Sequence, residues 1–197
     1  MGYTASLDTT HSLISLSQMK SSLGIGSGAG ASDDILTDLI NEASWFFKEE
    51  THRVLKSQSL TEFYDGPGGD VLYLRNKPVS GLTIWQDVGR DFATGSLIAS
   101  TAYELDEATG RVFLTGDVFS TAKHVIKTTY TGGYSTIPFN LKRAVATMIS
   151  QQYELNDHHA LATKSRSNDK GGTTSYFHDA PPSVLRALDI YTRTVII

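Results

Sequence analysis

Residues 32–52 read SDDILTDLINEASWFFKEETH, and this stretch decides the class of the fold. Ser32 is a favoured N-cap, and Asp33 and Asp34 place negative charge in the first turn, where the helix dipole stabilises it. Apolar residues at helical spacing then predict one buried face: Ile35, Leu36, Leu39, Ile40, Ala43, Phe46 and Phe47. The stretch therefore predicts an amphipathic helix from about Asp33 to about His52.

The segment before this helix is polar. Met1–Ser12 is rich in Thr and Ser and predicts a loose arm. Ser15 or Ser17 can cap a short helix, which Gly24 ends and whose apolar positions are Leu16, Met19 and Leu23. Glycines between residues 24 and 30 predict a flexible link.

After the long helix the hydrophobic period changes from helical to alternating. The segments that predict strands are Leu60–Tyr64, Val71–Leu74, Leu82–Val88, Tyr103–Leu105, Val112–Leu114 and His124–Tyr130. We expect Pro78 and Gly81 to break the chain and Gly89–Ser100 to form a loop. The pattern predicts a mostly antiparallel β region inserted at residues 59–134.

Helical periodicity returns after Pro138, a residue favoured in a first turn. The buried stripe of this second long helix, which ends near Leu155, is predicted to be Leu141, Ala144, Val145, Met148, Ile149 and Gln152. Residues 156–180 are polar and predict a flexible loop. A last helix, Ser183 to about Arg193, lies in the C-terminal segment 183–197.

The predicted class is therefore α+β. A small helical bundle, with three main helices and a short N-terminal one, carries the inserted mostly antiparallel β region within a single domain, residues 1–197.

Composition excludes several classes of protein. The 197 residues are 40% hydrophobic and 19% charged, so the chain can build a core. A net charge of -4 argues against a surface that wraps nucleic acid, and the absence of cysteine excludes disulfides and thiolate sites. No apolar run reaches the roughly 20 residues of a membrane span. Met1–Thr10 has no basic start followed by an apolar stretch, so we expect no secretory signal.

No catalytic, metal or cofactor site is predicted. The residues of metal-ligand type near the long loop are Asp157, His158, His159, His178 and Asp179. Adjacent histidines point in different directions, so a solvated polar loop is the favoured interpretation. The glycine runs lack the Lys and Ser or Thr of a phosphate loop, and no G-x-S-x-G motif is present.

Two clusters favour surface roles. Lys164, Arg166 and Lys170 are interpreted first as a solvated loop, and alternatively as weak contacts to phosphates or to a neighbouring subunit. Trp45, Phe46 and Phe47 are consecutive in a helix, so they cannot all face one core. At least one of them is expected near a surface or an interface.

The order of these motifs resembles the head–tail connector, or adaptor, proteins of tailed bacteriophages. The acidic-capped helix from Asp33 is followed by Phe63-Tyr64-Asp65-Gly66 and by Arg75-Asn76-Lys77-Pro78-Val79. Tyr130-Thr131-Gly132-Gly133-Tyr134 precedes the Pro138 helix, and Pro181-Pro182-Ser183-Val184 opens the last one. The resemblance covers about Leu13 to about Tyr191. The sequence departs from the family pattern in the insert Val88–Ser100 and in its polar N-terminal arm.

The resemblance implies a structural virion protein of the neck, made in the cytoplasm of the host bacterium. Such proteins form a ring, commonly dodecameric, under the portal protein and connect the head to a stopper or tail-completion protein. Double-stranded DNA passes through the ring without sequence recognition. The acidic net charge suits such a channel, because like charge opposes phosphate binding. No cofactor and no membrane are implied.

The C-terminal residues are the predicted portal contact: Tyr191, Arg193, Val195, Ile196 and Ile197. Three β-branched apolar residues at a terminus are unusual, and either docking on portal or folding back onto the bundle would bury them. The alternatives for the whole chain are a stopper or tail-completion protein, an α+β hydrolase, and a ligand-binding module in which Trp85 and Tyr103 stack on the ligand. Three helices around the sheet disfavour the first, because stoppers are usually dominated by β structure.

Overall fold

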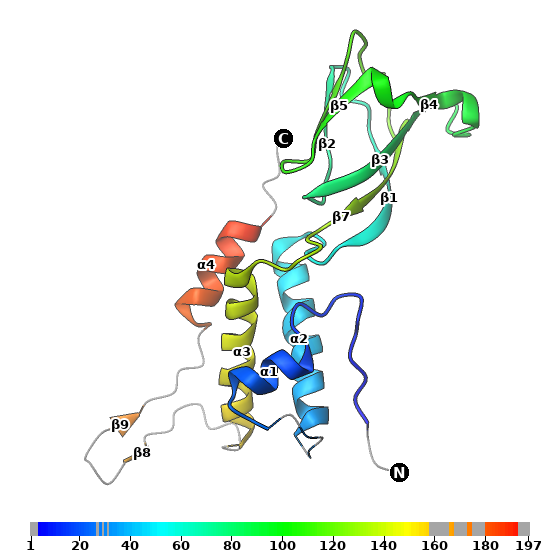
Figure 1. Ribbon diagram of the computed structural model, residues 1–197. Coiled ribbons are helices and arrows are strands. Elements are labelled where there is room, and N and C mark those ends of the chain that lie inside the picture. Colours follow the sequence, from blue (N-terminus) through cyan, green and yellow to red (C-terminus); the bar gives the residue numbers. More distant parts are fainter. Residues whose placement is uncertain are drawn as a thin grey trace. The chain divides into compact units, whose positions relative to one another are not determined.

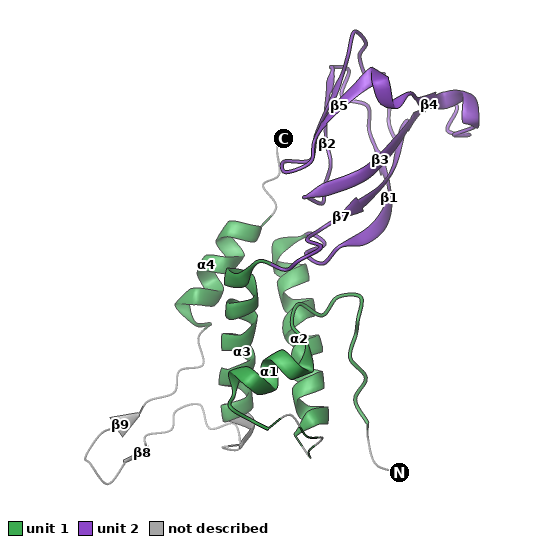
Figure 2. Cartoon of the chain, in the orientation of Figure 1, with its two compact units in different colours: residues 1–52, 138–197 green, residues 53–137 purple. Residues whose placement is uncertain are grey.

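The computed structural model describes residues 4–26, 28, 30, 32–157, 166–167, 173–174 and 180–192. The chain forms two compact units, one from residues 1–52 with 138–197 and one from residues 53–137 (Figure 2). The second unit contains the whole of the predicted β insertion, residues 59–134. The predicted α+β class, a helical bundle with an inserted antiparallel β region, is confirmed.

Four described helices build the first unit (Figure 1): α1 (Leu16–Ser22), α2 (Asp33–Thr51), α3 (Phe139–Asp157) and α4 (Pro182–Tyr191). α3 packs against α2 and α4, and α1 packs against α2. The most deeply buried of its larger apolar side chains, each at most 1% exposed, are Met19, Leu36, Ile40, Phe47, Leu141, Val145, Ile149 and Val184. The predicted helical stripes therefore form the core of the bundle.

The start of α2 differs from prediction in two ways. Ile35 is 45% exposed, because it lies about 100° around the helix from Leu36, outside the arc that the other helices cover. Ser32 precedes the helix but its hydroxyl makes no cap and instead accepts a hydrogen bond from Tyr153 Oη at 3.1 Å. Asp33 accepts from the buried ammonium of Lys20 at 2.7 Å, which ties α1 to α2.

α1 begins as the sequence indicated. Ser15 is its N-cap and forms a complete capping box with Gln18, with both hydrogen bonds at 3.2 Å. The helix ends before Gly24, whose φ of +69° is easy for glycine and strained for other residues. Of the two caps that the sequence offered, Ser15 is the one used.

The second unit holds two antiparallel sheets. One has the order β1 (Gln58–Tyr64), β7 (Ile126–Gly132), β3 (Val79–Gln86) and β4 (Leu97–Ile98). The other has the order β2 (Val71–Tyr73), β6 (Arg111–Leu114) and β5 (Tyr103–Asp106). Their core side chains are Tyr64, Leu72, Leu74, Val79, Ile84, Val112, Leu114, Phe119, Val125, Ile126 and Tyr130.

Two predictions for this unit are wrong. Gly81 was expected to break the chain, but β3 runs through it, and the register with β7 shifts between Ser80 and Thr83. Gly81 has a φ of +63°, so it is the residue that lets the strand bulge instead of ending. The expected loop Gly89–Ser100 contains β4, a two-residue strand that pairs with β3, between the 3₁₀ turns η1 (Thr94–Ser96) and η2 (Ser100–Ala102).

The two ends of the second unit are hydrogen-bonded to each other. Ser57 N donates to Tyr134 O at 3.1 Å, and Tyr134 N donates to Leu55 O at 2.8 Å. Gly133, at φ +98°, allows this approach, because a Cβ there would lie 2.8 Å from the Lys56 carbonyl oxygen. The backbone segments that enter and leave the β insertion are therefore hydrogen-bonded to each other, and we call this the base contact of the insertion.

α3 continues to Asp157, two residues past its predicted end. Within the predicted loop 156–180, the short strands β8 (Arg166–Ser167) and β9 (Thr173–Thr174) pair antiparallel. Among the described helices, none combines the length and apolar character that a bilayer crossing requires.

Candidate functional site

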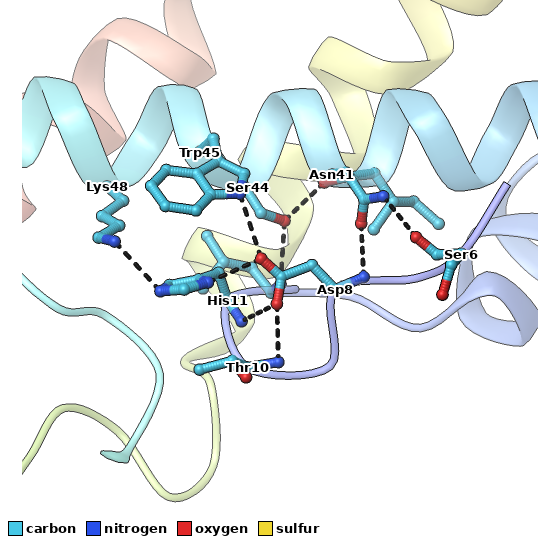
Figure 3. Close-up of polar contacts among 10 residues, drawn as sticks. Ser6, Asp8, Thr10, His11, Asn41, Ser44, Trp45 and Lys48 are labelled. Carbon is cyan, nitrogen blue, oxygen red and sulfur yellow. Dashed lines mark hydrogen bonds and ion pairs between the residues drawn. The ribbon is translucent and has the colours of Figure 1, made fainter. Parts of the chain in front are cut away.

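The N-terminal segment lies along α2 through a cluster that we call the arm anchor: Asp8, His11, Asn41, Trp45 and Lys48 (Figure 3). Asp8 Oδ2 lies 2.7 Å from His11 Nδ1 and accepts from Trp45 Nε1 at 3.1 Å. The hydrogen bond from His11 lowers the pKa of the Asp8 carboxyl below its usual value. Lys48 Nζ lies 3.1 Å from His11 Nε2, so Nε2 accepts and the ring carries its proton on Nδ1.

Backbone contacts extend the arm anchor in both directions. Asp8 N donates to Asn41 Oδ1 and Asn41 Nδ2 donates to Ser6 O, each at 2.9 Å. Leu13 N donates to Ser44 Oγ at 3.1 Å, and the Leu13 side chain is 2% exposed. The prediction of a loose arm at Met1–Ser12 is therefore wrong for residues 5–12. The attachment of the arm to α2 could not be predicted from the sequence, because the anchoring side chains are polar and carry no periodic signal.

Glu62 on β1 is the centre of a second polar cluster. Tyr130 Oη donates to Glu62 Oε2 at 2.6 Å, and Tyr64 Oη donates to the same oxygen. Asn76 Nδ2 donates to Glu62 Oε1 at 3.1 Å. Burial raises the pKa of Tyr130 to about 12 and raises that of Tyr64 as well. Both phenols therefore stay protonated at neutral pH and act as fixed donors to Glu62. The Tyr130 bond ties β7 to β1, whereas the Tyr64 bond lies within β1.

The aromatic residues of the ligand-binding alternative are engaged inside their own unit. Lys127 Nζ lies 5.0 Å from the centre of the half-buried Trp85 ring. Tyr103 is half-buried, and its hydroxyl donates to Leu82 O at 2.7 Å. Among the described residues, no three His, Asp or Glu side chains are grouped so that they could hold a metal ion. His158, His159, His178 and Asp179 lie outside that part of the chain.

Of the predicted portal contacts, Tyr191 is described. It is 6% exposed at the end of α4, and its hydroxyl donates to Asn140 Oδ1 of α3 at 2.6 Å. In this position it supports the packing of α4 on α3, and its contribution to portal binding stays a prediction. Arg193, Val195, Ile196 and Ile197 lie outside the described residues. So do Lys164 and Lys170, whereas Arg166 lies in β8.

A surface groove of about 660 Å³ runs between α1 and α3 and is called the α1/α3 groove below. Its lining residues are Ile14, Ser17, Gln18, Ser21, Ser22, Phe139, Lys142, Arg143, Ala146, Thr147 and Ser150. Phe139 is 79% exposed. Lys142 and Arg143 are the only charged residues of this lining, and neither has an ion pair within the described ranges.

This groove was not predicted, although the sequence carries one signal for it. Phe139 lies two residues before Leu141, so it points about 200° away from the buried stripe of α3. A large apolar residue opposite a helix's buried face marks a surface with a partner more often than a core position.

The outer face of α2 is the second candidate surface. It consists of Ile35, Asp38, Glu42, Trp45 and Glu49, all exposed and spaced along one stripe of the helix. Trp45 is 40% exposed, so the prediction that one of the three consecutive aromatics lies at the surface is confirmed. Phe47 is fully buried, and Phe46 is half-buried. Two of its three carboxylates, Asp38 and Glu42, lie between Ile35 and Trp45, and the third, Glu49, lies one turn beyond Trp45.

No family model and no curated protein matches the chain. It is similar in structure to a chain in the neck of the empty gene transfer agent (GTA) particle computed with C6 symmetry, with a TM-score of 0.61 and 18% identity over 100% of this chain and 98% of that one. A chain in the virion of the native GTA particle matches with a TM-score of 0.61 and 18% identity, over 100% of this chain and 96% of that one. A chain in the neck of the native GTA particle computed with C12 symmetry matches with a TM-score of 0.58 and 15% identity, over 100% of this chain and 96% of that one. At these identities the matches establish a shared fold over the whole chain.

Proposed function

We propose that the chain is a structural protein of a virion neck. It forms a ring under the portal protein, extends the DNA channel and connects the head to the stopper or tail. The observation that carries the proposal is the fold shared with chains of GTA neck and virion structures along almost the full length of both partners. The order of the connector motifs in the sequence supports it independently.

The ring and its passive channel are part of the proposal. Necks computed with C6 and C12 symmetry support a ring for this chain, and twelve copies are the number common among connectors. A net charge of -4 supports a channel through which DNA slides, since a surface that holds DNA neutralises phosphates with Lys and Arg. The described residues show surfaces and structural hydrogen-bond clusters, which suit an assembly protein better than a catalyst.

The test is reconstitution with portal. The purified chain is mixed with portal rings and imaged by electron cryo-microscopy, and its free mass is measured in parallel. We expect a ring with a central hole on the portal, and no binding of double-stranded DNA by the free chain at physiological salt. Failure to bind portal, or tight binding of free DNA, would contradict the proposed function.

A further inference from the structure

We propose that the α1/α3 groove of one copy receives the outer face of α2 from the next copy, and that this contact repeats around the ring. The inference rests on the proposed function, which supplies the ring, and adds the surfaces and the residues that would join its subunits. Both surfaces belong to the helical unit, so the contact needs no particular placement of the β unit.

Charge is complementary between the two surfaces. The groove presents Lys142 and Arg143, whereas the outer face of α2 presents Asp38, Glu42 and Glu49. Glu42 and Arg143 are both exposed, and neither forms an ion pair within the described part of the chain. Opposite charges across an interface attract and fix its register, while like charges placed together oppose association.

Apolar groups and shape match as well. On α2, Ile35 and Trp45 are ten residues apart, which is roughly 15 Å along a helix. On α3, Phe139 and Ser150 are eleven residues apart, which is roughly 16 Å. Small side chains line the groove between them, among them Ser17, Ser21 and Ala146, and these let a second helix approach closely. At one end the exposed Phe139 and Trp45 rings would bury one another, and at the other end Ile35 would lie beside Thr147.

The contact is heterologous, because a groove on α1 and α3 meets a different surface on α2. Heterologous contacts between identical chains generate rings when the rotation between neighbours closes. Each copy offers one groove and one outer face, so every copy in a closed ring has both surfaces covered. This accounts for two complementary exposed surfaces on one helical bundle.

Charge reversal tests the pairing. We expect Glu42→Lys alone and Arg143→Glu alone each to weaken self-association by about tenfold or more, because each places like charges together. Mixing the two variants restores assembly, since the reversed charge at position 42 of one copy then meets the reversed charge at position 143 of the next, and the ring alternates. The matched controls are Glu50→Lys on α2 and Arg186→Glu on α4, which make the same charge changes at exposed positions outside the two surfaces.

Cysteine cross-linking identifies the contact directly, because the chain contains no cysteine. Ile35→Cys and Thr147→Cys place one thiol on each surface, and their mixture should give an intermolecular 35–147 disulfide that peptide mass spectrometry detects. A mixture of Ile35→Cys with Arg186→Cys is the control and should cross-link far less. Both experiments are run on the free chain by sedimentation and on the chain assembled with portal.

The outcomes separate this inference from the proposed function. If rings form on portal and the two charge-reversal variants assemble like their controls, the groove contact is wrong and the neck function stands. If the wild-type chain forms no ring with or without portal, both are wrong. Loss in the single variants with recovery in their mixture supports the contact.

Discussion

Removing the Glu62 carboxylate should destabilise the β unit strongly. In the Glu62→Ala variant, the Tyr64 and Tyr130 hydroxyls lose their shared acceptor, and Asn76 Nδ2 loses Oε1. Tyr130 is 1% exposed and Tyr64 is 7% exposed, so water replaces these bonds poorly. A buried donor left unsatisfied costs about 1–3 kcal/mol, and the two phenols together about 2–6 kcal/mol. Because Glu62 itself is half-buried, we expect about 3 kcal/mol.

Glu62→Gln refines the test. Its carbonyl oxygen can still accept from both phenols, but its amide then faces Asn76 Nδ2, also a donor. Turning the Asn76 amide would break the 2.6 Å bond from Val54 N to Asn76 Oδ1. One mismatched pair predicts a loss of about 1–2 kcal/mol.

The assay is urea unfolding followed by the fluorescence of Trp85. The chain has two tryptophans, Trp45 in the helical unit and Trp85 in the β unit, so a Trp45→Phe background reports on the β unit alone. Glu104→Ala is the matched control, because Glu104 is exposed on β5 of the same unit, and we expect it to stay within about 0.5 kcal/mol of its parent. Equal losses for Glu62→Ala and Glu104→Ala would refute the reasoning.

Three further predictions concern Tyr130, the N-terminal arm and the C-terminal residues. Tyr130 has a folded pKa of about 12 against an ordinary value of 10.0, so its contribution to stability is complete below pH 10 and falls as the pH rises from 10 toward 12. Tyr130→Phe should make that limb of a stability-against-pH curve less steep, and Tyr64, whose pKa burial also raises, should keep part of the slope. Asp8→Ala should release the arm from α2, seen as faster proteolysis between residues 4 and 12 with little change at α3, and an unchanged rate would show that the anchor is not what holds the arm. Deleting residues 194–197 should leave the melting temperature of the free chain unchanged and abolish assembly on portal, whereas a lower melting temperature with normal assembly would make this segment part of the core.

Periodic burial explains which parts of the fold were predictable. The apolar stripes of α2 and α3 and the alternation in β1 and β7 each repeat a buried position, so the sequence carries the signal several times. β4 has two residues, too few for any period, and it exists because β3 offers it an edge. Gly81 was misjudged because glycine at positive φ serves a bulge as well as a turn.

The candidate surfaces were less predictable than the helices and strands, because they depend on contacts between distant segments and not on a repeated pattern. An exposed aromatic was predicted, because three consecutive aromatics cannot share one helix face, but the structure was needed to show that it is Trp45. Lys142 and Arg143 look like any solvated pair on a helix, and only the neighbouring turn of α1 makes them the lining of a groove. The arm anchor depends on contacts between residues more than thirty positions apart, such as Asp8 with Asn41 and Trp45, which no local pattern encodes.

The base contact of the insertion, between Leu55–Ser57 and Tyr134, affects the cost of bringing α2 and α3 together during folding. An unfolded insertion of residues 53–137 would separate α2 from α3 by a long chain, and closing that loop would cost roughly 2.5 kcal/mol more than closing a five-residue link. Once the base contact forms, the insertion connects α2 and α3 as a short turn would connect two antiparallel helices. The β unit can then gain or lose loop length at its far end without changing the cost of assembling the helices, so its size is free to vary while the bundle stays the same.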